Sequence, residues 1–185
     1  MLLPLHSLSQ DSLRTVRATH PFAIKAGYMQ GHVDGGYLLL GAEREVLRNS
    51  SIEVNLGFLP FNPKFIQNSP FFGLSATIEF KQFIAFHKHG LAGLFVGLHL
   101  GGNHNLRYYL NPRSKYSTAT WGQAGGTFGF QWPLFPRWVL GAAVKGGYSN
   151  VVQYRYFSRT GKPLGTQVIG QPATFFVAAQ LSFIL

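Results

Sequence analysis

The sequence predicts an all-β fold, a closed antiparallel eight-stranded transmembrane β-barrel with short periplasmic turns and longer extracellular loops. Apolar and polar residues alternate with a period of two in segments of roughly ten residues, the length that a tilted transmembrane strand needs. Charged residues make up only 12% of the chain and hydrophobic residues 46%, which indicates that water is not its only solvent. The 22 glycines and 15% aromatic residues suit strands that separate a crowded lumen from lipid.

Each predicted strand has one face of large apolar side chains and one face of polar or small side chains. In the last segment, Phe175, Val177 and Leu181 alternate with Ala178 and Gln180. An even number of strands lets an antiparallel barrel close with both termini on one side. The eight segments cover residues 22–28, 38–46, 52–58, 72–80, 94–101, 127–132, 138–149 and 175–185.

The connections differ in length, as expected at the two ends of an outer-membrane barrel. Short turns at 47–51, 87–90 and 133–137 are predicted to face the periplasm. Longer connections, richer in Asn, Ser, Pro, Arg and Lys, are predicted to be extracellular, with the short loop at 31–36 as an exception. These long connections cover residues 60–70, 107–120 and 152–173.

A soluble lipocalin-like barrel would also have eight alternating strands, but its apolar face would point into the cup. Here the glycines share the polar face and the bulky Phe, Leu and Val residues gather opposite, which favours lipid outside and a narrow lumen inside. Aromatic residues near the predicted strand ends suit the headgroup layer on either side of the bilayer. They are Tyr28, Tyr37, Trp121, Trp132, Trp138 and Tyr148.

Two domains of the sequence are predicted, residues 1–19 as a signal-peptide remnant and lead-in, and residues 20–185 as the barrel. Ser7 and Ser9 occupy small-residue cleavage positions after an apolar stretch, and cleavage after Ser9 would leave Gln10 first. Because the basic start and most of the apolar core of such a signal are missing, we expect the precursor to begin further upstream. A secreted barrel of this kind is expected in the cell outer membrane.

Charge and cysteine content exclude some classes of partner and site. The chain has no cysteine, which rules out disulfides and thiolate metal sites. A net charge of +10 predicts attraction to polyanions, lipopolysaccharide phosphates among them. Lys and Arg are dispersed between the strands and form no basic run, so no nucleic-acid partner is predicted.

Four of the six acidic residues fall on the predicted lumen face. Charges in a narrow barrel should form paired networks, because burying one unpaired costs several kcal/mol, and the lumen of eight strands has little room beyond side chains. We expect Glu45 opposite Glu53, with Leu47 paired to Ser51, and Lys25 in contact with Glu43. The predicted lumen charge network consists of Lys25, Glu43, Glu45, Glu53, Glu79, Lys81 and Lys145.

Residues that could carry chemistry give weak signals. His99, Ser75 and Ser149 are all predicted to face the lumen, whereas a hydrolase acting on lipid needs its serine and histidine at the lipid face or the rim. His87 and His89 lie in one turn, and His99 and His104 lie elsewhere, so no set of three or four converging metal ligands is apparent. The glycine-rich segment 31–36 lacks the lysine of a phosphate loop. We therefore predict no catalytic residue, metal or cofactor.

The chain also resembles a known family. The stretch 90–103, the glycine-rich segment 122–129, the segment 131–138 and the segment 41–56 are similar to small Bacteroidetes-type outer-membrane β-barrel proteins of unknown function. The resemblance covers most of residues 20 to 150. It implies a barrel and an outer-membrane address, and it supplies no catalytic or binding residue.

The predicted function is that of a non-enzymatic outer-membrane protein which anchors the envelope and displays cationic loops. Arg155, Arg159 and Lys162 in the last long connection are candidates for contact with lipopolysaccharide or a partner protein. We expect a monomer. Two alternatives remain open, a lipid-modifying hydrolase and a narrow channel or small-ligand transporter.

Overall fold

A computed structural model describes residues 22–31, 35–47, 49–59, 71–85, 91–108, 116–149, 152–158, 160–169 and 173–185. The predicted signal remnant and the turn with His87 and His89 lie outside these residues. In the described part of the chain, no helix is long and apolar enough to cross a membrane. The strands are β1 (Phe22–Gly31), β2 (Gly35–Leu47), β3 (Ser50–Leu59), β4 (Phe71–Ala85), β5 (Gly93–Tyr108), β6 (Tyr116–Phe135), β7 (Trp138–Ser149), β8 (Val152–Phe157), β9 (Pro163–Ile169) and β10 (Thr174–Ile184).

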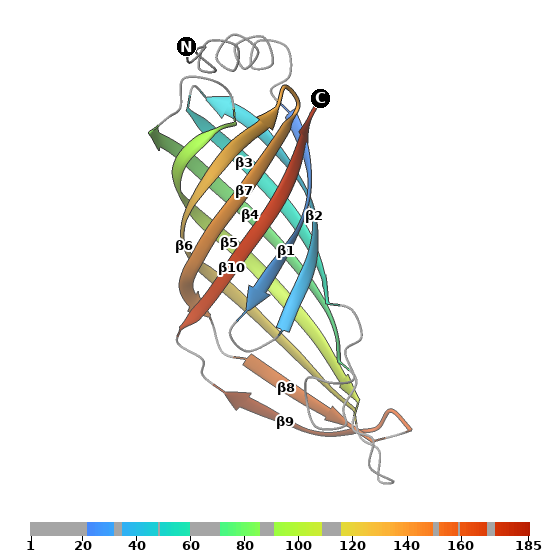
Figure 1. Cartoon of the computed structure of the whole chain (residues 1–185). Helices are drawn as coiled ribbons and strands as arrows, with labels where there is room; N and C mark the ends of the chain where they lie inside the picture. Colours follow the sequence, from blue (N-terminus) through green and yellow to red (C-terminus); the bar gives the residue numbers. More distant parts are fainter. Residues whose placement is uncertain are drawn as a thin grey trace, which may run out of the picture.

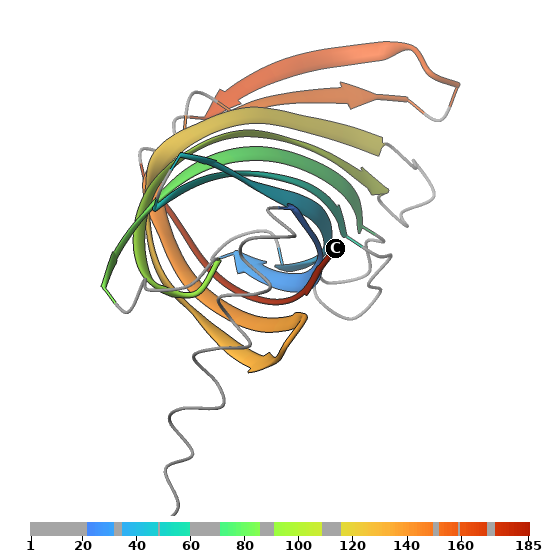
Figure 2. The same cartoon turned by 90° about the horizontal axis from the view of Figure 1, so that it is seen from above.

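Eight of the strands close into an antiparallel barrel (Figures 1 and 2). The ring runs β1-β2-β3-β4-β5-β6-β7-β10, and β10 pairs back onto β1. Register partners followed once around the ring from Phe22 of β1 lead to Phe175 of β10. Because the next residue, Phe176, pairs with Gly31, the path returns to β1 about ten residues beyond Phe22, and this displacement is the stagger of the barrel. Eight strands with this stagger tilt by about 43° on a backbone cylinder of about 8 Å radius, which side chains fill. The predicted fold class is confirmed.

The two remaining strands prolong the barrel wall. The β8–β9 ladder continues the register of the β7–β10 ladder. In an antiparallel ladder the numbers of paired residues have a constant sum, and this sum is the same for Gly147–Thr174 and Val152–Ile169. β6 pairs with β7 and then, shifted by one residue, with β8. The hairpin stands beside β6 at the end of the barrel away from the C-terminus (Figures 1 and 2). We call the outer sheet the assembly of His104–Tyr108, Tyr116–Thr120, β8 and β9.

The outer sheet corrects two predicted loops. The connection expected at 107–120 is shorter, because β5 continues to Tyr108 and β6 begins at Tyr116, and most of the connection expected at 152–173 is β8 and β9. The hydrophobic pattern missed these strands because beyond the bilayer neither face of a strand needs to be apolar. In β9, residues on both faces are exposed.

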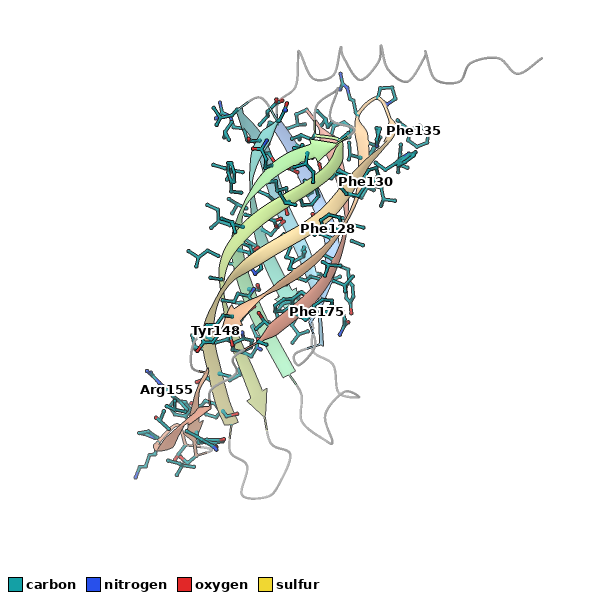
Figure 3. All side chains as sticks on the ribbon, turned by 90° about the vertical axis from the view of Figure 1, so that its left-hand side faces the viewer. Phe128, Phe130, Phe135, Tyr148, Arg155 and Phe175 are labelled. Carbon is teal, nitrogen blue, oxygen red and sulfur yellow. The ribbon has the colours of Figure 1, made fainter. Side chains whose placement is uncertain are left out.

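The outer wall of the barrel is apolar, as the alternation predicts. Along β3, exposed Ile52, Val54, Leu56 and Phe58 alternate with buried residues. Among the large hydrophobic side chains of the described residues, Leu98 is the most exposed, at 70%. Figure 3 shows Phe135, Phe130, Phe128, Phe175 and Tyr148 distributed along this wall. A continuous apolar surface of this extent needs lipid rather than water as its solvent.

The aromatic prediction holds for some residues and fails for others. Trp132, Trp138 and Tyr148 lie on the outer wall, 58%, 40% and 64% exposed. Tyr37 and Trp121 are instead buried in the lumen, at 0% and 6% exposure. Both occupy the lumen-facing positions of their strands, so the period-two pattern decides their side and their closeness to a strand end does not.

Gly125 of β6 and Gly146 of the neighbouring strand β7 should respond differently to substitution by alanine. A Cβ on Gly125 would lie 2.2 Å from the Gly146 carbonyl oxygen and 2.5 Å from the Gly147 Cα, whereas a Cβ on Gly146 would meet nothing nearer than the Thr174 oxygen at 4.0 Å. We expect Gly125→Ala to lower the free energy of unfolding by about 3 kcal/mol, because backbone must move, and Gly146→Ala by under about 0.5 kcal/mol. Urea unfolding in vesicles measures both, and equal effects would contradict the close contact of β6 with β7.

Candidate functional site

The lumen holds a buried set of charged side chains at the level of the membrane. Each of its members is at most 3% exposed. Three are cationic and three anionic, so the charges of these six residues balance. We call this set the charge network: Lys25, Lys81, Lys145, Glu43, Glu53 and Glu79.

The three carboxylates form one row across neighbouring strands. Glu43 of β2 pairs in register with Glu53 of β3, and Glu53 pairs with Glu79 of β4. Carboxylates that face each other directly across strands repel. The row therefore depends on neighbouring cations, and the three lysines supply them.

The lysines bridge the carboxylates from β1, β4 and β7. The Lys25 Nζ lies 2.5 Å from the Glu43 Oε2 and also contacts Glu53. Lys81 contacts Glu53, with its Nζ 3.5 Å from the Glu43 Oε2. Lys145 contacts Glu79. Because low-dielectric surroundings strengthen paired charges and penalise unpaired ones, each member holds the others in place.

Amide side chains extend the charge network across the whole lumen. Gln131 of β6 donates to the Glu43 Oε2 at 2.9 Å, although β6 and β2 lie on opposite sides of the ring. Gln180 of β10 donates to the Glu53 Oε1 at 3.1 Å, and Asn55 donates to the same oxygen at 2.5 Å. Ser51 donates to Glu43. The hydrogen bonds of Gln131 and Gln180 reach across the lumen, and those of Asn55 and Ser51 join the carboxylates to the wall beside them.

Apolar side chains cover the charge network on the side of the short turns. Ala23, Phe83, Phe95, Val139 and Ile184 belong to one buried cluster close to the short turns. The Lys81 Nζ lies 4.7 Å from the centre of the Phe95 ring, a cation–π distance. A second buried cluster lies nearer the outer end: Met29, Tyr37, Leu39, Leu59, Phe176 and Ala178.

This filling argues against ion conduction. An ion entering the lumen would have to break cross-barrel contacts such as Gln131–Glu43 and displace the apolar cluster around Phe95. We expect the purified protein to give no discrete conductance steps in planar bilayers at 1 M KCl, since a side-chain-filled eight-stranded barrel has no continuous aqueous path. Reproducible steps above the bilayer baseline would show that the lumen opens.

Glu45 corrects one predicted position. Glu53 faces Glu43, and Glu45 faces Ser51, where it is half-buried. The predicted pairing of Leu47 with Ser51 is wrong because Leu47 pairs with Ser50 across a tight turn in which Asn49 has φ 74°, and a bulge lies between Glu45 and Leu47. Asparagine tolerates this left-handed conformation. The predicted contact of Lys25 with Glu43 is confirmed.

The alternative chemistries find limited geometric support. The His99 Nδ1 lies 3.2 Å from the Thr127 Oγ1, and Ser75 and Ser149 are buried on the lumen side, away from lipid. His104 is on the outer wall, its Nδ1 2.7 Å from the Thr120 Oγ1. Within the described ranges, no three His, Asp or Glu residues gather as metal ligands would.

The predicted loop cations occupy different settings. Arg155 is exposed on β8, and Lys162 is exposed just before β9. Arg159 lies outside the described residues.

The prediction missed Ser51, Asn55, Gln131 and Gln180 as partners of the carboxylates. Their signal was their place on the polar face, but alternation gives the side of a residue and not its reach across the lumen.

Comparisons with known proteins agree with the barrel. The model of a family described as "Protein of unknown function (DUF3575)" matches residues 16–184. A major outer membrane protein from Thermus thermophilus is similar in structure, with a TM-score of 0.55 and 13% identity, covering 90% of this chain and 100% of that one. CarO from Acinetobacter baumannii gives a TM-score of 0.43 and 10% identity, over 91% of this chain and 99% of that one. No curated protein matches the sequence.

Proposed function

The chain belongs to the DUF3575 family of proteins of unknown function, and we propose that it is a non-enzymatic barrel of the bacterial outer membrane that holds a cationic sheet against lipopolysaccharide. The observation that carries the proposal is the outer sheet, which continues the lipid-facing wall beyond the hydrophobic band and bears Arg155 on the same face. The bacterial group indicated by the resemblance stays a prediction. In this proposal the closed barrel anchors the protein in the envelope, and the outward face of the outer sheet contacts lipopolysaccharide.

The strand register places Arg155 on the face that continues the membrane wall. Arg155 pairs with Thr118, and directly paired residues project to the same side of a sheet. Thr118 shares its side of β6 with exposed Thr120 and Phe128, whereas the buried lumen residues of β6 have odd numbers. The outward face of the outer sheet thus begins where the lipid-facing wall ends, and Figure 3 shows Arg155 beyond Tyr148 along the same direction.

The composition of this face suits a phosphorylated glycolipid. Arg155, Thr118 and Thr166 lie in one row of register partners, and the stacked rings of Tyr116 and Phe157, 4.8 Å apart, form the next row. A guanidinium binds phosphate with a planar pair of donors, and hydroxyl groups add hydrogen bonds. Flat aromatic faces provide apolar contact for sugar rings.

The charge distribution supports an external anion as partner. The sequence has no Asp or Glu from residue 80 to residue 185, although this half contains Arg107, Arg113, Lys115, Arg155 and Lys162. The two buried lumen cations of this half, Lys81 and Lys145, are already paired with Glu53 and Glu79. The cations of the outer sheet therefore have no acidic counterpart in their own half of the sequence, which favours attraction to anionic headgroups.

Binding to lipopolysaccharide tests the proposal. The folded protein in neutral detergent is titrated with lipopolysaccharide and with a dephosphorylated preparation, following tryptophan fluorescence. We expect Arg155→Gln to weaken binding to the phosphorylated form about fivefold, the loss of one charge-assisted contact. Lys162→Gln, a matched exposed cation near the hairpin end, should change it less than about twofold.

The same titration can reject the proposal. Equal affinity for both lipid preparations would exclude phosphate recognition, and an Arg155→Gln protein that binds as tightly as the parent would exclude this face. A heat-modifiable band in the outer-membrane fraction tests the address, because closed barrels resist unfolding by detergent at room temperature. Release of fatty acids from lipid vesicles would instead favour the hydrolase alternative.

A further inference from the structure

Five buried residues of β5 and β6 bear polar atoms without a hydrogen-bond partner among the described residues. One is the Gln131 Oε1, in a side chain that already donates to Glu43, and the remaining atoms belong to four residues. These atoms are the His99 Nε2, both amide atoms of Asn103, the Asn105 Nδ2 and the Gln123 Oε1. The four side chains are between 2% and 4% exposed. We call them the amide cluster: His99, Asn103, Asn105 and Gln123.

The amide cluster is contiguous on the inner wall. His99, Asn103 and Asn105 are lumen-facing residues of β5, and Gln123 is the register partner of Gly101, which lies between His99 and Asn103. Gly101 has no side chain that could form a hydrogen bond with these neighbouring polar groups. The unpartnered atoms therefore surround one stretch of the lumen wall rather than scattered points.

A dry interior does not explain this arrangement. Buried amide groups in native proteins are nearly always hydrogen-bonded, because an unsatisfied one loses its interaction with water and gains nothing. Exchanging the oxygen and nitrogen of Asn103 changes nothing, since neither atom has a partner. An apolar residue would be more stable at this position if nothing bound there.

The surroundings define what can bind. On the neighbouring strand β4, the register partner of His99 is Glu79, already in contact with Lys145. On another side, the Tyr37 hydroxyl reaches across the lumen and donates to the Asn105 Oδ1 at 3.0 Å. The charges of the six described residues of the charge network balance, so an ion would find no counter-charge left over among them. The free atoms include both donors and acceptors, which suits a neutral molecule that can do both.

We infer that the amide cluster is a binding site for small neutral hydrogen-bonding molecules, either ordered water or a polyol of glycerol size. Water and polyols share the hydroxyl chemistry that this site recognises, giving a hydrogen bond to the Gln123 and Asn103 oxygens and accepting one from the Asn103 and Asn105 amides. This inference is independent of lipopolysaccharide binding, because it concerns the opposite face of the wall.

Replacing an amide by an apolar side chain of similar size separates an occupied site from an empty one. If molecules bind at the cluster, Asn103→Leu removes their partners and lowers the urea midpoint by about 0.5 M. If the amide is unsatisfied, the same substitution leaves the midpoint unchanged or raises it. Ser182→Ala is the control, because the Ser182 Oγ is also buried without a partner but lies outside the cluster, and it should leave the midpoint unchanged.

Solution NMR of the unmodified barrel in detergent tests the occupant directly. Cross-relaxation between water and the side-chain amide protons of Asn103 and Asn105 would identify water. Saturable shifts of these signals on addition of glycerol, lost in Asn103→Leu, would identify a polyol. The absence of both signals in the unmodified protein would overturn the inference, and this result does not depend on whether the variant folds. An Asn103→Leu urea midpoint equal to or above that of the parent would also overturn it.

Discussion

Lys25→Met is expected to lower the free energy of unfolding by about 3 kcal/mol, in the range for breaking a buried ion pair. Lys25 joins Glu43 and Glu53, which face each other in register. Without it, two buried carboxylates share Lys81, whose Nζ is 3.5 Å from the Glu43 Oε2. Methionine fills a similar volume, so the loss reports charge rather than a cavity. Urea unfolding in lipid vesicles measures the change.

Lys162→Met is the matched control for this substitution. Lys162 is exposed near the end of the β8–β9 hairpin, and its replacement should cost under about 0.5 kcal/mol. A similar small loss for both variants would mean that the lumen is wet enough to screen Glu43 and Glu53. A change in the slope of the urea dependence would indicate altered compactness instead of altered stability.

The barrel could be predicted from sequence because a lipid-facing wall imposes a strong pattern. In β3, each second residue from Ile52 to Phe58 must be apolar, and each residue between must fit a narrow lumen. A shift by one residue would expose Glu53 to lipid, so the side of each residue is well determined. The hairpin β8–β9 escaped prediction because it lies beyond the lipid and no such constraint acts on it.

Six of the seven predicted members of the charge network and the contact of Lys25 with Glu43 could be predicted, but the pairing of the carboxylates could not. Alternation placed Lys25, Glu43 and Glu53 inside, whereas the partner of Glu53 depended on the turn before it. Asn49 in a left-handed conformation and the bulge after Glu45 move the register by two residues relative to the predicted pairing. Such local backbone choices are decided by a few residues, and hydrophobic periodicity does not register them.

Reach across the lumen was equally hidden from the sequence. Gln131 and Glu43 are 88 residues apart and on opposite strands of the ring, yet they are hydrogen-bonded. The contact exists because the stagger of the strands brings these two positions to one level of a lumen narrow enough for two side chains to span. Strand order and stagger come from the closed barrel as a whole, which no single segment encodes.

The pair Lys145–Glu79 should show strong coupling in a double-mutant cycle. Lys145→Met leaves the buried Glu79 carboxylate, whose Oε1 has no hydrogen-bond partner in the described residues, without its cation, so we expect a loss of about 3 kcal/mol. Glu79→Gln strands Lys145 but also relieves repulsion with Glu53, its register partner, so about 2 kcal/mol is expected. The double variant removes both charges together and should lose only about 1 to 2 kcal/mol, since a neutral pair needs no compensation. Urea unfolding of the four proteins in identical vesicles gives the coupling energy. If the stability losses of the two single variants add up to the loss of the double variant, Lys145 and Glu79 are solvated separately and are not bound to each other across the lumen.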